Sequence, residues 1–377
     1  MTQHQKIDPS TIHDTPAKVS DLLNLHEIVA KARQNLNQND WDYIVGGAES
    51  ETTLRRNRMA LETLAFRPRI LRDVSNVDAT TNQFGRKMRL PLIFAPVGSL
   101  ESFHPAGAAS VVKAAKEFGV GHMLSSVCDP GLEELAEIAP DALRLYQLYV
   151  RGDADWVDDH VERAIKHGYS GFALTVDTAH YSRRERDIAK RFVTAGRRRV
   201  QNRIYQAGLD WKTVERIKKK FNIPLAIKGI ATGEDARIAV EHGVEWVYVS
   251  NHGGRQLDHG RGSVDVLPEV ADAVGGRAKV IVDGSICRGS DIVKAIANGA
   301  DLVAMGRMQC FALGAAGEAG VLRLLELLED EMQRSMGLLG VNKLSDLNRS
   351  YLHPAPPTQF PHALSAFNLL KLEEYRY

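Results

Sequence analysis

Short apolar runs and amphipathic segments alternate eight times along this chain between residues 92 and 336. The apolar runs cover residues 92–96, 122–126, 143–150, 172–177, 225–230, 246–252, 280–284 and 302–307. Their nearly unbroken apolar character is typical of strands that are buried on both faces of a parallel sheet. The intervening segments have helical periodicity over residues 108–118, 132–138, 154–167, 211–221, 234–242, 264–274, 291–298 and 314–336.

Eight successive strand–helix units predict an α/β fold whose sheet closes into a (β/α)8 TIM barrel. An open doubly wound sheet is the alternative, but no glycine-rich dinucleotide fingerprint follows an early strand. A chain of 377 residues could hold two or three domains, yet a barrel with extensions accounts for this length as one unit. We therefore expect residues 21–377 to form a single domain that includes a C-terminal tail.

The residues before the first predicted barrel strand form three regions. Residues 1–20 are polar without sustained periodicity, which predicts a flexible arm. Residues 21–48 show helical spacing of apolar positions and end at a glycine pair, which predicts a preface of short helices. Residues 62–90 predict loops and small strands that lead into the barrel.

Composition excludes several classes of protein. The formal net charge of +1 provides no basic field, so no nucleic-acid partner is expected. The cysteines Cys128, Cys287 and Cys310 are too widely spaced for a metal pattern or a disulfide framework, and they predict reduced thiols in a cytoplasmic protein. No apolar signal core or run of about 18 apolar residues is present, so no membrane anchor is expected.

Polar residues interrupt six of the apolar runs near their carboxyl ends. Because active sites of barrel enzymes lie at this end of the strands, these residues are candidates for one site. They are Gln147, Tyr149, Thr175, Asp177, Lys228, Ser250, His252, Asp283 and Arg307.

The sixth run ends in a base next to a guanidinium group. His252 and Arg255 are separated by two glycines that allow a sharp turn or the close approach of a flat ligand. This pair suits a substrate that loses a proton while its carboxylate is bound. From these residues alone, a strand-end histidine with satisfied hydrogen bonds and a solvated arginine remain an equal alternative.

The segment Ser250-Asn-His-Gly-Gly-Arg-Gln-Leu-Asp258 resembles the signature of the FMN-dependent 2-hydroxy acid oxidase and dehydrogenase family, which includes glycolate oxidase, lactate oxidase and mandelate dehydrogenase. Further stretches resemble this family in the same order: Trp41-Asp-Tyr-Ile with Gly46-Gly-Ala48, Ala95-Pro96, His104-Pro105, Leu124-Ser-Ser126, Gln147-Leu-Tyr149, Leu174-Thr-Val-Asp177, Arg183-Arg184-Glu185, Lys228-Gly229, Asp283-Gly284 and Gly306-Arg307. The resemblance extends from about Leu25 to Leu347 and implies an FMN-binding (β/α)8 barrel. Tetramers or octamers are usual in this family, which implies a homo-oligomer.

The resemblance implies catalytic roles for two residues. His252 is the expected active-site base, whether the carbon proton leaves first or the hydroxyl proton leaves together with a hydride. Asp177 is expected to orient the imidazole and to stabilise its protonated form; a helix-capping aspartate is its alternative role. Two arginines and two tyrosines form the implied substrate-binding set: Tyr43, Tyr149, Arg184 and Arg255.

The implied cofactor is FMN, and no metal is expected. Lys228 is expected near flavin N1 and O2, where a buried cation stabilises the negative charge that reduction brings. Side chains expected at the edge of the isoalloxazine ring are Ser125, Gln147, Thr175 and Ser250, and the backbone expected at its face is that of Pro96, Val97 and Gly98. The loops after the seventh and eighth strands are expected to bind the phosphate through Asp283, Gly284, Ser285, Gly306 and Arg307.

The chain departs from the family pattern at the phosphate loop. Cys287 stands where the family usually has an arginine on the phosphate, and Ser285 replaces a glycine. Arg307 and backbone amides remain and Arg288 could swing in, so FMN binding is expected to be retained but weakened.

Two further departures concern the substrate. The segment 191–208 is short, has a basic cluster at 197–199 and has no apolar helix, so a membrane-binding insertion is not expected. Val127 replaces a large aromatic residue and Tyr181 a usually aliphatic one, which favours a substrate bulkier than glycolate. Gly98 stands where oxidases often have alanine, which favours a dehydrogenase, with an oxidase as the close alternative.

Three functions remain possible at this point. The first is oxidation of an L-2-hydroxy acid to the 2-oxo acid, with oxygen or another carrier as acceptor. The second is an isomerase or lyase built on an FMN- or phosphate-binding barrel. The third is a catalytically degenerate relative, which the intact Asp177, Arg184, His252 and Arg255 argue against.

Overall fold

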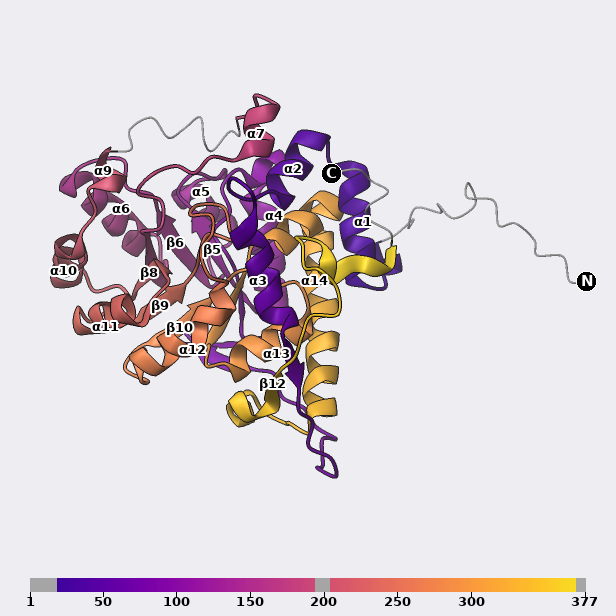
Figure 1. The fold of residues 1–377 in the computed structure, drawn as a ribbon. Coiled ribbons are helices and arrows are strands. Elements are labelled where there is room, and N and C mark those ends of the chain that lie inside the picture. Colours follow the sequence, from indigo (N-terminus) through magenta and orange to yellow (C-terminus); the bar gives the residue numbers. More distant parts are fainter. Residues whose placement is uncertain (1–18, 194–203, 371–377) are drawn as a thin grey trace, which may run out of the picture.

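A closed barrel of eight parallel strands forms the centre of the molecule in the computed structural model, which describes residues 19–193 and 204–370 (Figure 1). Its strands follow one another around the barrel in chain order: β4 (Leu92–Phe94), β5 (Gly121–Ser125), β6 (Arg144–Leu148), β7 (Gly171–Thr175), β8 (Leu225–Ile230), β9 (Trp246–Val249), β10 (Lys279–Val282) and β11 (Leu302–Met305). The strand residues are almost all buried, as their apolar sequences require. The predicted (β/α)8 barrel is confirmed.

The strands end earlier than the sequence suggests. Tyr149, Asp177 and His252 lie in loops just past β6, β7 and β9, and Arg307 is the first residue of the last helix. Assigning these residues to strands was wrong because the paired ladder stops before them. The loops thereby carry the polar side chains beyond the packed barrel interior.

Helices cover the outside of the barrel (Figure 1). Seven agree with the predicted segments to within two residues: α4 (Ala108–Phe118), α5 (Leu132–Ile138), α6 (Ala154–Lys166), α10 (Trp211–Lys220), α11 (Gly233–Glu241), α12 (Ser263–Val274) and α13 (Gly289–Ala297). The last element, α14 (Arg307–Leu339), begins before the predicted position 314 and is kinked at Ala316 and Gly317. Gly317 adopts a φ of 60°, a left-handed conformation that favours glycine.

Within the described residues, three α-helices precede the barrel. Asn24 and Asn37 cap α1 (Leu25–Asn35) and α2 (Gln38–Val45) by accepting hydrogen bonds from backbone N–H groups of the first turn. The third helix, α3 (Thr52–Glu62), was not predicted. Of the predicted flexible arm, residues 1–18 lie outside the described residues, and its last two residues begin a short 3-10 helix, Val19–Asp21.

The remaining elements are small. They are β1 (Leu64–Phe66), which pairs with β12 (Leu352–Pro354), the hairpin of β2 (Thr81–Gln83) and β3 (Arg86–Met88), α7 (Glu185–Ala189), α9 (Ile204–Ala207), and 3-10 helices at Leu100–Ser102, Leu344–Asp346, Arg349–Tyr351 and Ser365–Leu370. The basic cluster at 197–199 lies outside the described residues.

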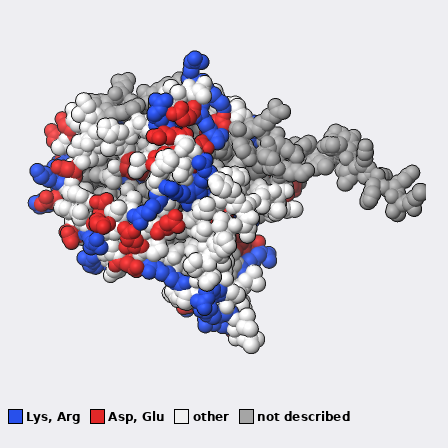
Figure 2. Space-filling view, viewed as in Figure 1, with Lys and Arg blue, Asp and Glu red and all other residues white. Residues whose placement is uncertain are grey.

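The surface agrees with the small net charge. Acidic and basic side chains are interspersed over much of the face shown in Figure 2. No described helix is long and apolar enough to cross a membrane. The three cysteines, all within the described residues, are buried and form no disulfide bond.

Candidate active site

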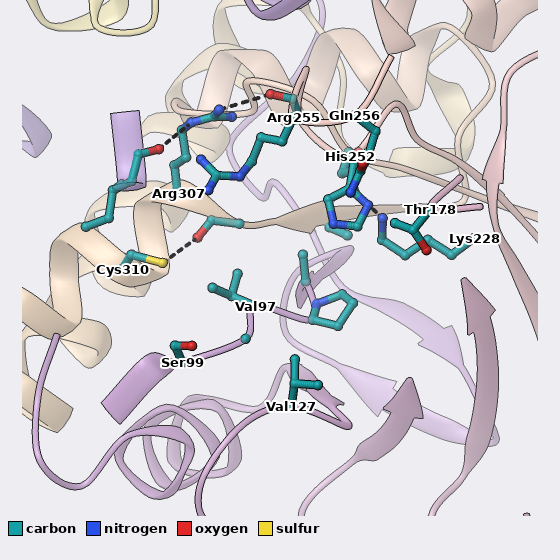
Figure 3. Close-up of a pocket in the computed structure, with 18 of the residues that line it drawn as sticks. Val97, Ser99, Val127, Thr178, Lys228, His252, Arg255, Gln256, Arg307 and Cys310 are labelled. Carbon is teal, nitrogen blue, oxygen red and sulfur yellow. Dashed lines mark hydrogen bonds and ion pairs between the residues drawn. The ribbon is translucent and has the colours of Figure 1, made fainter. Parts of the chain in front are cut away.

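A cavity opens at the carboxyl ends of the barrel strands (Figure 3). It contains about 1390 Å³ of space, open mouth included. Its lining combines apolar side chains with a few charged and polar ones, as is typical of a site for a small ligand. Arg255 and Arg307 lie next to each other on one wall, with Val97 and Val127 across from them.

His252 lies between two hydrogen-bond partners in this cavity. Its Nδ1 is 3.0 Å from Oδ1 of Asp177, and its Nε2 is 3.2 Å from the hydroxyl oxygen of Tyr149. Because a carboxylate only accepts, Nδ1 carries the proton and the lone pair of a neutral ring is on Nε2. His252 thus presents a base at Nε2 toward Tyr149 and the cavity.

Burial sets the protonation of this group. Burial lowers the pKa of His252 despite the opposing charge of Asp177. For Asp177, burial acts to raise the pKa, but the charges of His252 and Lys228 outweigh it and the pKa is lowered. Burial also raises the pKa of Tyr149, which therefore keeps its proton. The arrangement combines a neutral imidazole, a carboxylate and a phenol.

The turn after β9 places the imidazole. His252 and the two following glycines, Gly253 and Gly254, all have φ between 59° and 74°. A Cβ on Gly253 would lie 2.8 Å from Nη1 of Arg307, and one on Gly254 would lie 2.5 Å from the backbone nitrogen of Leu54. The two glycines are required because α3 and Arg307 pack directly against this turn.

Two guanidinium groups lie close to the ring of Tyr43. The Cζ atom of Arg255 is 4.5 Å from the ring centroid and that of Arg184 is 5.7 Å from it. Arg255 donates through Nη1 to the carbonyl oxygens of Tyr43 and Gly46 at 2.5 and 2.9 Å. Nη2 of Arg255 and Nε of Arg184 are buried without a hydrogen-bond partner in the described part of the chain. Two adjacent buried cations with unused donors suit a carboxylate ligand.

Lys228 belongs to a buried polar network at the base of the cavity. Its Nζ donates to Oγ of Ser250 at 2.8 Å, and Oγ of Ser250 donates to Oδ2 of Asp283 at 2.9 Å. Gln147 donates through Nε2 to Oγ1 of Thr175 at 2.8 Å, which leaves its buried Oε1 without a partner among the described residues.

The residues expected to bind FMN divide into two groups. Those that line the cavity are Pro96, Val97, Gly98, Lys228, Asp283, Gly284, Ser285, Gly306 and Arg307. The other four, Ser125, Gln147, Thr175 and Ser250, are buried just outside the lining. A cationic lysine, an unpaired amide acceptor and the guanidinium group of Arg307 fit a ligand with a polar ring edge and an anionic tail, which are features of FMN.

Arg307 adds a second positive charge next to Arg255. It donates to the carbonyl oxygens of Ile44, Gly46 and Gly253 at 2.9–3.0 Å. Burial, followed by the charge of Arg255, lowers the pKa of Arg307 to about 10, so it remains a cation at neutral pH.

Cys287 also lines the cavity but brings no charge. Burial raises the pKa of its thiol to about 11. Arg288 points away: its guanidinium group forms an ion pair with Glu331 at 2.5 Å and contacts Nδ1 of His26 at 3.3 Å. In this conformation Arg288 does not replace the missing arginine.

Several residues of the site were not predicted. Arg58 of α3 forms two hydrogen bonds of 2.8 and 2.9 Å with Asp291 and donates to the carbonyl oxygen of Ser285 at 3.1 Å, which fixes the loop after β10. Phe103, Arg151, Thr178 and Gln206 line the cavity. The periodicity of residues 52–62 could have indicated α3, but no sequence signal marks Gln206.

Val127 and Tyr181 both line the cavity, as expected for residues that shape the substrate site. A Cβ on Gly98 would lie 2.8 Å from Cγ2 of Val127. Gly98 and Val127 are therefore coupled, because an alanine at 98 would require the valine to move.

Comparisons with known proteins agree with this geometry. A model of the FMN-dependent dehydrogenase family matches residues 32–354. The chain is 39% identical to glycolate oxidase of Spinacia oleracea, over 88% of this chain and 96% of the relative. It is 37% identical to L-lactate oxidase of a Nostoc species, over 89% of this chain and 99% of the relative.

Solved structures give the same result. A crystal structure of mandelate oxidase has a TM-score of 0.82 and 36% identity, covering 88% of this chain and 98% of that chain. A mandelate oxidase variant with a C4a-OH-FMN adduct has a TM-score of 0.80 and 37% identity, over 87% of this chain and 98% of that chain.

Proposed function

The chain belongs to the family of FMN-dependent 2-hydroxy acid oxidases and dehydrogenases, with FMN as cofactor, and we propose that it oxidises an L-2-hydroxy acid to the 2-oxo acid. One observation carries this proposal. His252, with a hydrogen-bond partner on each ring nitrogen, shares a cavity with the guanidinium groups of Arg184 and Arg255. A base and a carboxylate site are what removal of a proton from a 2-hydroxy acid requires.

His252 is the proposed base. Its lowered pKa keeps Nε2 unprotonated near neutral pH, so that Nε2 can take the proton from the α-carbon or from the hydroxyl group. Asp177, 3.0 Å from Nδ1, stabilises the resulting imidazolium. Tyr149, protonated and 3.2 Å from Nε2, can donate to the substrate oxygen that becomes the carbonyl.

The substrate carboxylate is proposed to bind Arg184 and Arg255. Each group has one unused donor, Nε of Arg184 and Nη2 of Arg255, so the two together can bind both oxygens of a carboxylate. Tyr43, whose ring lies close to both guanidinium groups, is proposed to restrict their orientation and to place its own hydroxyl group at the same end of the substrate.

Bound FMN supplies the two-electron acceptor. The proposed contacts are Lys228 at the N1–O2 edge, Ser125, Gln147, Thr175 and Ser250 along the ring edge, Pro96, Val97 and Gly98 at the ring face, and Asp283, Gly284, Ser285, Gly306 and Arg307 toward the phosphate. Lys228 places a buried cation where negative charge arrives, which favours electron transfer from the substrate.

The proposed substrate is bulkier than glycolate. Val127 leaves more room than an aromatic residue would, and Phe103 and Tyr181 add aromatic surface to the lining. The similarity to structures of mandelate oxidase supports an aryl or long side chain. Electrons then pass to oxygen or to another carrier.

The test is reduction of the cofactor in the absence of oxygen. The FMN-loaded protein is mixed anaerobically with L-2-hydroxy acids of increasing size, and bleaching of the oxidised flavin absorbance is followed. We expect the flavin to bleach faster with mandelate-like than with glycolate-like acids. Air is then admitted, and the rate of flavin reoxidation is measured. No bleaching by any acid, in protein that dithionite does reduce, would contradict the proposed oxidation. Preference for glycolate would contradict only the substrate size.

A further inference from the structure

The strands that carry both partners of His252 lose their direct pairing just before those residues. The last paired residues of β6 and β7 are Leu148 and Leu174. Tyr149 follows the end of β6 and Asp177 lies two residues past the end of β7. In this parallel register, the next hydrogen bond would join the amide N–H of Val150 to the carbonyl oxygen of Thr175.

The side-chain amide of Gln206 occupies that position instead. Its Oε1 accepts from the backbone N–H of Val150 at 2.7 Å, and its Nε2 donates to the carbonyl oxygen of Thr175 at 2.8 Å. One acceptor and one donor thus continue the ladder as a peptide group would. Gln206 is 7% exposed and lines the cavity.

This bridge lies immediately beside the catalytic geometry. Val150 follows Tyr149, and Thr175 precedes Asp177 by two residues. The His252 ring lies between the side chains of Tyr149 and Asp177, at 3.2 Å from the hydroxyl oxygen of Tyr149 and 3.0 Å from Oδ1 of Asp177. The separation of the two strand ends therefore determines whether His252 can contact both partners.

We propose that Gln206 is a positioning residue for His252: its amide, inserted between Val150 and Thr175, sets the separation of the strand ends that bear Tyr149 and Asp177. This inference rests on the proposed role of His252 and extends the site to a residue outside the barrel strands. Gln206 belongs to α9, in the segment between β7 and β8, so this segment contributes directly to the active-site geometry.

The test uses Gln206→Met, which keeps the length of the side chain and removes both hydrogen bonds. We expect kcat/KM to fall about 10- to 100-fold, because small misplacements of a catalytic group have effects of this order. The charge of Asp177 raises the pKa of His252. A longer distance between Asp177 and His252 should therefore lower that pKa and move the acidic limb of the kcat/KM profile to lower pH. Gln206→Leu is the second variant, and Ile204→Gln, an exposed position of the same helix, is the control.

The pKa of His252 can be measured directly by NMR. In 15N-labelled, FMN-loaded protein, the His252 resonance, assigned by its loss in His252→Gln, is titrated in each variant. A lower His252 pKa in both Gln206 variants, with wild-type behaviour of Ile204→Gln, supports the proposal. An unchanged pKa with only a lower melting temperature would show that Gln206 is purely structural. If no hydroxy acid reduces the wild-type flavin, the proposed function fails, but this titration still decides the role of Gln206.

Discussion

The part of the cavity proposed to bind the substrate, around His252, differs from the part proposed to bind the phosphate, around Cys287. The two parts differ in how many of the expected groups are present. At the proposed substrate end, His252 has a partner on each ring nitrogen, and the guanidinium groups of Arg184 and Arg255 lie close to the ring of Tyr43. At the phosphate end, Cys287 is neutral and Arg288 is paired with Glu331 instead of facing the cavity. The groups for proton transfer are thus complete, whereas the cofactor anchor has one cation fewer than the resemblance implied. Catalytic capacity and cofactor affinity can therefore vary separately in this chain.

The largest effect is expected from His252→Gln. Removing the base should lower kcat by about 100- to 10,000-fold, the usual contribution of general base catalysis. FMN affinity should change little, because the substitution leaves the phosphate end intact. Stopped-flow flavin reduction measures the rate, and fluorescence titration measures FMN binding. His242→Gln, at the end of α11 against Trp211, is the control. Reduction at the wild-type rate in His252→Gln would contradict the role of His252 as base.

The next effect is expected from Arg255→Lys. A lysine keeps the positive charge but loses the planar set of guanidinium donors and the position over the Tyr43 ring. We therefore expect kcat/KM to fall about 10- to 100-fold, equivalent to roughly 1.5–3 kcal/mol. Arg89→Lys is a matched control, because Arg89 forms two 2.6 Å hydrogen bonds with Glu329 outside the cavity. Steady-state kinetics with one hydroxy acid compares the variants. A loss of equal size in both would show a general effect on the fold.

A smaller effect is expected at the other end of the cavity, from Cys287→Arg. A guanidinium group beside Arg307 should tighten FMN binding about tenfold through one charge-assisted contact. Riboflavin, which has no phosphate, should bind with unchanged affinity, so titrations with both ligands isolate the charge. Cys287→Lys tests the same charge with a different shape, and Cys287→Met adds volume alone. Unchanged FMN affinity in both charged variants would contradict the idea that this end is weakened.

The sequence predicted the barrel, and it indicated the proposed catalytic residues for a related reason. Buried parallel strands require apolar runs, so polar residues such as Lys228 and Asp177 stand out at their ends. The conformation of Arg288 could not be predicted, because it depends on Glu331 of α14 and His26 of α1, far away in the chain. Gln206 could not be predicted either, since its partners are backbone groups, which leave no pattern in the sequence.

The smallest expected effect is a shift of the pH profile, which tests the balance of burial and charge at the substrate end. Burial lowers the pKa of His252 below 6.5, so kcat/KM should stay constant as pH falls to about 6.5 and decline only below it, when the base becomes protonated. Asp177 opposes this shift. Asp177→Asn should therefore move the acidic limb to still lower pH, while kcat falls because the imidazolium loses its partner. The pH profile of kcat/KM is measured by anaerobic flavin reduction between about pH 4.5 and 9. Movement of the limb to higher pH in Asp177→Asn would mean that solvent entry, rather than the lost charge, dominates the pKa of His252.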